Sequence, residues 1–394
     1  MNEQSPLILA IDEGTSNAKA VLVNELGQVI ARGSRALSIS HPQTGYSEQD
    51  PLLIWKNTLA AIDDCLAQID RPISAMAISN QRESAVAWDR ATGTPLSPVI
   101  SWQCRRSLPL CNQLHQQGHA AIIMAKTGLA LDPMFSAGKF RWILDHLENG
   151  HARATSGEIC LGTIDSWLLW NLSGGRVFAT DYSNAARTQL FNLHTCAWDA
   201  ELLELFAIPA AALAPIQPSA GFFAETAEFG RLKAGVPVLS MIGDSHAALY
   251  GQGGFAPGLV KATLGTGSSL MTPMTGPIAS SYGLSTTLAW HDGSAPTYAM
   301  EGNIVHTGAA VQWASRLLAA GETLDSLTEQ AALLPDNGGV YFVPALSGLG
   351  APHWKAEARG LICGLTEGTS GAHILRASLE SIGYKIRDVF EAME

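Results

Sequence analysis

Four short polar segments in this chain of 394 residues each follow an apolar run, and their side chains are suited to phosphate and hydroxyl chemistry. They are residues 12–15 (DEGT), 80–83 (NQRE), 243–246 (GDSH) and 265–267 (GTG). Ligands of open α/β sheets bind beyond the carboxyl ends of the strands, where we expect these segments to lie. Any one of them fits an ordinary surface loop equally well. Together they offer a carboxylate for Mg²⁺, two phosphate turns, an Arg-Glu pair and a second acid, a set that indicates phosphoryl transfer to a hydroxyl.

Other catalytic motifs are absent from the sequence. It contains no GxxxxGK[ST], no GxGxxG after a strand, no HExxH and no GxSxG. These absences exclude a P-loop protein and disfavour a dinucleotide-binding domain, a zinc enzyme and a hydrolase with a nucleophile elbow.

The composition is typical of a large globular protein with an acidic surface. Apolar residues make up 47% and charged residues 15%, and 394 residues are enough for two domains. The net charge of -11 argues against nucleic acid or an anionic membrane as a partner, because both attract basic surfaces. Six scattered cysteines, no signal peptide and no apolar run long enough to cross a membrane lead us to expect a cytoplasmic protein.

The elements that must position the four segments alternate between strands and helices. Residues 7–24 predict two strands around the first segment, and a third strand should follow the turn at 25–27. Buried strands are expected at 73–80 and 236–243, each ending in a polar segment. Apolar residues at three- and four-residue steps predict helices at 51–69, 108–126 and 136–148. This alternation favours an α/β architecture.

The opening pattern returns about 250 residues later. The stretch LVKATLGTGSSLMTPM (259–274) repeats the strand, turn and strand of LILAIDEGTSNAKAVLV (7–23). Helices are expected to follow at 305–320, at 323–334 and from 372 to the end. The repeat predicts two related domains, 1–250 and 251–394, with the boundary near the glycine-rich GQGGFAPG.

Several longer stretches resemble one known family. They include AIDEGTSNAKAVL, AISNQRES, GDSHAALYGQ, LGTGSSL and ARGLICGLTEGTSGAHILRASLES, in the family's order. On these stretches the sequence resembles the FGGY family of carbohydrate kinases, of the actin-like ATPase clan, and most of all its glycerol kinases. The resemblance implies two actin-like (ribonuclease H-like) domains with mixed sheets flanked by helices. It also implies ATP-dependent phosphorylation of a hydroxyl on a small polyol or sugar, and it leaves a homodimer open.

The resemblance also implies roles for residues that match the family's motifs. The metal and nucleotide side would use Asp12 for Mg²⁺, with a set of ATP contacts in both domains: Thr15, Ser16, Lys19, Gly265, Thr266, Gly308 and Gln312. The substrate side would use Arg82 and Glu83 to hold hydroxyl groups, Trp102 as an apolar wall and Asp244 as the general base. Arginine donates and carboxylate accepts, so this pair suits a diol.

Four departures from the family pattern affect these expectations. Three concern the substrate pocket, where Met134, Ser245 and Ser269 replace a tyrosine, a glutamine and a phenylalanine. We read them as a roomier, more polar pocket for a longer polyol or a ketopentose, although Met can fill the space of Tyr and small hydroxyls can hold water.

The fourth departure is that family members continue beyond Glu394, which predicts a truncated, incomplete second domain. The alternative interpretation is therefore a catalytically impaired sugar-binding pseudokinase, or a fragment without the adenosine pocket. An actin- or Hsp70-like ATPase is a further alternative, and Arg82, Glu83 and Trp102 argue against it.

Overall fold

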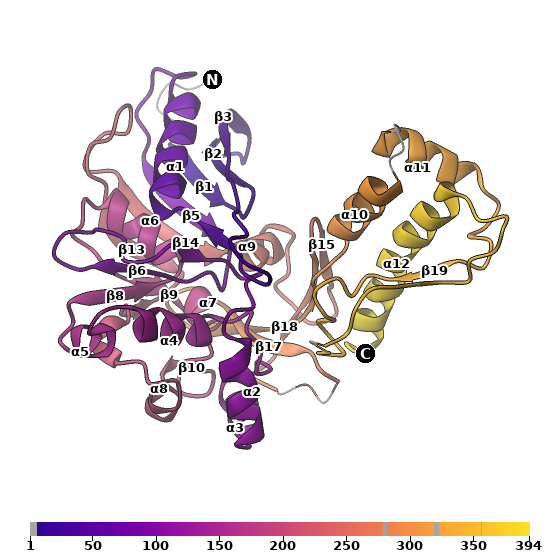
Figure 1. Cartoon of the computed structure of the whole chain (residues 1–394). Coiled ribbons are helices and arrows are strands. Elements are labelled where there is room, and N and C mark those ends of the chain that lie inside the picture. The colour runs from indigo at the N-terminus through magenta and orange to yellow at the C-terminus, as the bar shows by residue number, and fades with distance from the viewer. Residues whose placement is uncertain (1–5, 279, 281, 319–322, 356) are drawn as a thin grey trace. The chain divides into compact units, whose positions relative to one another are not determined.

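The computed structural model describes residues 6–278, 280, 282–318, 323–355 and 357–394, and the chain divides into two compact units (Figure 1). The first unit runs to Ala247 and also includes Thr287–Tyr298. The second unit consists of Ala248–Thr286 and Ala299–Glu394. No described helix is long and apolar enough to cross a membrane.

A mixed six-stranded sheet forms the centre of the first unit, in the order β13-β14-β5-β1-β2-β3. Its strands are β1 (Leu7–Glu13), β2 (Asn17–Asn24), β3 (Val29–Ala36), β5 (Ala75–Asn80), β13 (Ala220–Glu225) and β14 (Pro237–Gly243). The strands β1, β5 and β14 are parallel, whereas β2, β3 and β13 are antiparallel to their neighbours. The three strands predicted at the N-terminus and the two predicted strands that end in polar segments are confirmed.

The core of this sheet follows from the alternation of side chains along its strands. In β1 every second residue is buried, beginning with Leu7, because successive side chains point to opposite faces. The buried face packs with helices α1 (Pro51–Leu66) and α6 (Ile164–Leu172) in one continuous core. Asp50 caps α1 by accepting hydrogen bonds from the backbone N–H groups of Leu52 and Leu53, so the predicted helix start is correct.

The remaining elements of the first unit are shorter, and several of them surround a second apolar core that includes Ile100, Phe140 and Phe206. The remaining strands are β4 (Glu48–Gln49), β6 (Val86–Asp89), β7 (Val99–Ile100), β8 (Ile159–Gly162), β9 (Thr180–Asp181), β10 (Phe191–Asn192), β11 (Ala197–Trp198) and β12 (Ile216–Gln217). The remaining helices are α2 (Leu108–Gln116), α3 (Ala120–Thr127), α4 (Ser136–His146), α5 (Gly150–Thr155), α7 (Tyr182–Ala185), α8 (Ala200–Phe206) and the 3₁₀ turn η1 (Ala210–Ala212).

The helix predicted at 108–126 is wrong as a single element. The chain forms α2 and α3 with a break between them, where Gly118 has φ +84°. A left-handed residue cannot continue a right-handed helix, and glycine adopts this conformation without a steric penalty. The apolar periodicity continued across the break because both helices bury apolar residues, among them Leu114 and Ile123.

The second unit begins within α9 (Asp244–Gly251) and contains the repeated strand-turn-strand pattern. Its sheet has the order β15-β16-β18-β17, and the far end of the β17–β18 hairpin belongs to the first unit. The remaining elements are β15 (Lys261–Leu264), β16 (Ser268–Met274), β17 (Ser285–His291), β18 (Pro296–Ile304), β19 (Tyr341–Val343), β20 (Leu361–Cys363), α10 (Gly308–Leu318), α11 (Leu324–Leu333) and α12 (Gly371–Glu391). The three helices predicted here are confirmed within the described residues, and residues 319–320 of the first prediction lie outside them.

Candidate active site

The carboxyl ends of three parallel strands meet at one edge of the first-unit sheet. Asn80, the last residue of β5, is the register partner of Glu13 in β1 and of Gly243 in β14. The segments after these strands therefore start side by side, although they are far apart in the sequence. This register places residues 12–15, 80–83 and 243–246 around the same point, as the sequence predicted.

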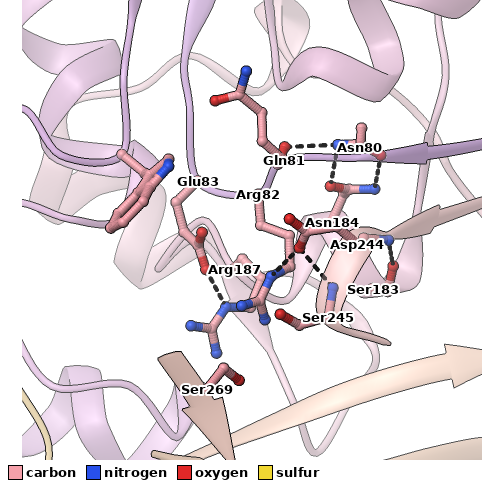
Figure 2. Close-up of polar contacts among 12 residues, drawn as sticks. Asn80, Gln81, Arg82, Glu83, Ser183, Asn184, Arg187, Asp244, Ser245 and Ser269 are labelled. Carbon is pink, nitrogen blue, oxygen red and sulfur yellow. Dashed lines mark hydrogen bonds and ion pairs between the residues drawn. The ribbon is translucent and has the colours of Figure 1, made fainter. Parts of the chain in front are cut away.

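The short helix α7 holds two of these strand ends in place. The side-chain amides of Asn80 and Asn184 are paired, with N–O distances of 2.9 and 3.2 Å. The backbone N–H of Gly243 donates to the hydroxyl of Ser183 at 2.9 Å (Figure 2). Because buried amides and hydroxyls are costly to leave unpaired, these contacts restrict the ends of β5 and β14 to one arrangement.

Asp244, the expected general base, is paired with a cation. The Nε of Arg82 lies 3.2 Å from its Oδ1, and the backbone N–H of Ser245 donates to the same oxygen at 2.6 Å. The side chain of Arg82 is buried, whereas 42% of the Asp244 side chain remains accessible. Desolvation raises the pKa of the Asp244 carboxyl, Arg82 lowers it and the charge of Glu83 raises it. The carboxylate is thus oriented, reachable and more basic than an ordinary Asp.

Glu83 is held by a residue that the sequence analysis missed. Its Oε1 accepts a hydrogen bond from Nε of Arg187 at 2.6 Å, and both side chains are buried. Figure 2 shows Arg187 and Glu83 pointing toward each other beside the Arg82–Asp244 pair. The expected Arg82 and Glu83 do lie together, but in the structure each is paired with an opposite charge from another segment.

The turn after β1 contacts the expected apolar wall. The indole N–H of Trp102 donates to Oγ1 of Thr15 at 2.9 Å, and the side-chain amide of Gln49 donates to the Thr15 carbonyl at 3.0 Å. Ser16 is exposed. One expected phosphate contact, Thr15, is therefore joined directly to one expected substrate contact, Trp102.

Asp12 and Lys19 form an ion pair at the same turn. They face each other across β1 and β2, with Nζ 3.0 Å from Oδ2, and both side chains are about half exposed. No cluster of three or more His, Cys, Asp or Glu side chains that could hold a metal occurs among the described residues. A single accessible carboxylate still fits Mg²⁺, which commonly binds one or two carboxylates, substrate phosphates and water.

The three residues that depart from the family pattern are all buried. Met134 and Ser245 lie in the first unit, with 9% and 8% of their surface accessible. Ser269, in the second unit, donates its hydroxyl to Oε1 of Glu301 at 2.7 Å. The small hydroxyl thus already has a carboxyl oxygen as its acceptor, which gives this position a fixed polar character.

The glycine turn of the second unit is fastened to the start of α10. The backbone N–H of Gly308 donates to the Gly265 carbonyl at 2.9 Å, and that of Ala309 donates to the Thr266 carbonyl at 3.0 Å. A Cβ at position 308 would lie 2.6 Å from the Gly265 oxygen, so only glycine permits this approach. Gly265, Thr266 and Gln312 are exposed, whereas the Gly308 N–H is already used within the protein.

In the first-unit sheet the first three strands along the chain, β1, β2 and β3, are antiparallel, and β5 and β14 then run parallel to β1. An acid, Asp12, lies near the end of β1, and polar side chains follow the carboxyl ends of the parallel strands. This arrangement defines the actin-like (ribonuclease H-like) phosphotransferases. The chain belongs to the FGGY family of carbohydrate kinases, whose N-terminal domain matches residues 7–251 and whose C-terminal domain matches residues 260–394.

Curated relatives agree with this assignment. The chain is 52% identical over 393 residues to an apulose kinase of Pectobacterium atrosepticum. The aligned region covers 99% of this chain and 79% of that protein. It is 44% identical to glycerol kinase 2 of Thermotoga maritima, over 98% of this chain and 79% of that protein. The chain is thus an ATP-dependent kinase of a sugar or polyol. The aligned region covers 79% of the length of each of these two relatives. Both are named as kinases, which gives no support to the alternative of a catalytically impaired pseudokinase.

Solved structures show the same fold. The glycerol kinase of Plasmodium falciparum with ADP superimposes with a TM-score of 0.87 at 29% identity, covering 99% of this chain and 78% of that one. A ligand-bound xylulose kinase from Lactobacillus acidophilus also gives 0.87, at 24% identity, over 98% of this chain and 78% of that one. The predicted pair of actin-like domains with mixed sheets is confirmed.

Proposed function

We propose that this kinase transfers the γ-phosphoryl group of ATP to a hydroxyl of a ketose or polyol larger than glycerol. The observation that carries the proposal is the grouping of Arg82, Glu83 and Asp244 at the aligned ends of β5 and β14. In this proposal residues 1–250 bind the sugar and the metal–phosphate group, and residues 251–394 bind the nucleotide.

The substrate residues act through their charges. Glu83 accepts a hydrogen bond from one hydroxyl, and Arg82 donates to a neighbouring hydroxyl oxygen. Trp102 lies against the carbon chain. Asp244 takes the proton of the attacking hydroxyl while its oxygen forms the new bond to the γ-phosphorus, and the bond from that phosphorus to the leaving ADP oxygen breaks.

The ATP residues lie on both glycine turns. Asp12 would hold Mg²⁺, which offsets the negative charge of the phosphoryl oxygens when it is bound. Thr15, Ser16 and Lys19 donate to phosphate oxygens, and Lys19 can exchange its bond with Asp12 for one with a phosphate. Gly265 and Thr266 form the second phosphate turn, Gly308 holds that turn in shape, and Gln312 contacts the nucleotide.

The preference for a larger substrate rests on Met134, Ser245 and Ser269. Two aromatic walls and one amide of the glycerol kinase pattern are replaced by flexible or small side chains, which leaves room and adds hydroxyls. The apulose kinase relative makes apulose the first substrate to test. The six cysteines, all free and all among the described residues, are in keeping with a reducing, cytoplasmic location.

A substrate panel tests this proposal. The chain is incubated with MgATP and with glycerol, apulose, xylulose, ribulose or longer polyols, and ADP release is measured with and without EDTA. We expect EDTA-sensitive turnover and a kcat/KM for a ketose or longer polyol at least ten times that for glycerol. Turnover with glycerol as the best substrate would refute the size preference, and ADP release independent of every sugar would refute the proposed reaction.

A further inference from the structure

Glu83 has an unusual backbone conformation that its neighbours stabilise. Its φ is +62°, in the left-handed region that residues other than glycine rarely adopt. Its carbonyl accepts hydrogen bonds from Oγ of Ser136 at 3.1 Å and from Nζ of Lys139 at 3.0 Å. Strained residues persist where the surroundings determine their conformation, and they are common at functional sites.

Lys139 ties two parts of the proposed substrate pocket together. It is fully buried on α4, and its ammonium group also donates to the carbonyls of Met134 and Phe135. Desolvation lowers its pKa to about 8, and the charge of Glu83 is the largest opposing influence. One cation thus fixes the backbone of Glu83 against the segment that contains Met134.

Arg187 fixes the other end of Glu83, its carboxylate. Arg187 lies two residues after α7, and α7 is anchored through the Asn184–Asn80 amide pair. The guanidinium carbon of Arg187 lies 5.2 Å from the centre of the Phe135 ring, and its Nε donates a hydrogen bond to Oε1 of Glu83. The hydrogen bond from Nε to Oε1, at 2.6 Å, holds the Glu83 carboxylate in one orientation.

We infer that Arg187 is a positioning residue for sugar binding, which holds the Glu83 carboxylate in the orientation that accepts a hydrogen bond from a substrate hydroxyl. Glu83 has 5% of its surface accessible, and its carboxylate is paired with the buried guanidinium of Arg187. Without Arg187 the carboxyl group would lose this hydrogen bond and be free to rotate, so a substrate hydroxyl would lose its fixed acceptor. This inference rests on the proposed function, in which Glu83 binds the sugar.

A double-mutant cycle tests the inference in the full-length chain. Arg187→Met, Glu83→Gln and the double variant are compared for the KM of the best sugar, the KM of ATP and kcat. We expect Arg187→Met to raise the sugar KM about 10- to 100-fold with an ATP KM within twofold. In the Glu83→Gln background the same change should add less than twofold, because its effect passes through Glu83.

Two further variants separate positioning from loss of folding. Arg187→Lys keeps the cation but loses the guanidinium fork, so it should remain folded and raise the sugar KM by about 3- to 20-fold. It replaces Arg187→Met in the cycle if that variant does not fold. Arg153→Met removes an Arg–Asp pair elsewhere in the first unit, with an N–O distance of 3.2 Å, and should leave the sugar KM unchanged.

The possible outcomes have different meanings. A Glu83→Gln variant with the parent's sugar KM overturns the substrate role of Glu83, and the inference with it. If Glu83→Gln weakens sugar binding but the Arg187 variants do not, or if the two effects multiply in full, the proposed function stands and Arg187 is not its positioning residue.

Discussion

Replacing Asp244 by Asn removes a base while keeping its shape. The amide has nearly the same volume, and its oxygen can still accept the 2.6 Å hydrogen bond from the backbone N–H of Ser245. The change relieves the desolvation of a carboxylate but gives up its ion pair with Arg82. Because these effects oppose each other, we expect the variant to fold and to melt within a few degrees of the parent.

The loss should appear in catalysis. A positioned base contributes roughly 10²–10⁴-fold, or about 3–5 kcal/mol of barrier. The Asp244 carboxylate is held from two sides, by Arg82 and by a backbone N–H, so we expect the upper part of this range, about 10³–10⁴ in kcat. Steady-state ADP release measures kcat, and calorimetric titration of the sugar without ATP should show affinity within about threefold of the parent.

The pH dependence gives a second readout of the same base. Catalysis requires ionised Asp244, and its raised pKa means that kcat/KM falls at a higher pH than it would for an ordinary Asp. Arg82 opposes this shift, so Arg82→Gln should move the acidic limb to still higher pH. Asp145→Asn is the control. Asp145 also forms an ion pair, with an N–O distance of 2.8 Å to Arg141, and it is not one of the proposed site residues. An Asp244→Asn variant that keeps more than a tenth of the parent kcat would refute the assignment.

Three further predictions concern specificity, coupling and stability. Met134→Tyr combined with Ser269→Phe should shift kcat/KM toward glycerol by at least tenfold, and an unchanged preference would contradict the roomier pocket. Thr15→Val removes the 2.9 Å hydrogen bond to the Trp102 indole, so it should raise the KM values of both sugar and ATP by about 3- to 10-fold, whereas an effect on ATP alone would show that the bond does not couple the two contacts. Desolvation, with the nearby Asp181 charge, raises the pKa of buried Asp165 to about 6. Between about pH 4 and pH 6 the folded state therefore binds a proton that the unfolded state does not, and the free energy of unfolding falls as the pH rises through 6. Asp165→Asn should therefore gain stability relative to the parent between pH 5 and pH 7, by roughly 1–3 kcal/mol in denaturant titrations, and a pH-independent difference would contradict this.

Local patterns were enough to predict the elements and the positions of the polar segments. Alternating burial in β1, the Asp50-Pro51 helix start and the repeated glycine turn depend on residues within one or two turns of each other. The break between α2 and α3 was missed because the apolar period continued across Gly118, and a single glycine does not reveal the sign of its φ. Lys139 left a signal that was not used, since it occupies the apolar face of α4 four residues before Ile143.

The partners of the charged residues were decided by the tertiary structure. Asp244 appeared as an isolated carboxylate in the sequence, and Glu83 as the neighbour of Arg82. Folding pairs Arg82 with Asp244, because β5 and β14 are adjacent, and pairs Glu83 with Arg187, 104 residues away, because α7 is anchored at those strand ends. The sequence by itself determined which chemical groups lie at the strand ends, since these follow from the residue types there. Which charges neutralise one another, and that Arg187 and Lys139 join the site, depends on packing between distant segments, and only the folded chain brings those segments together.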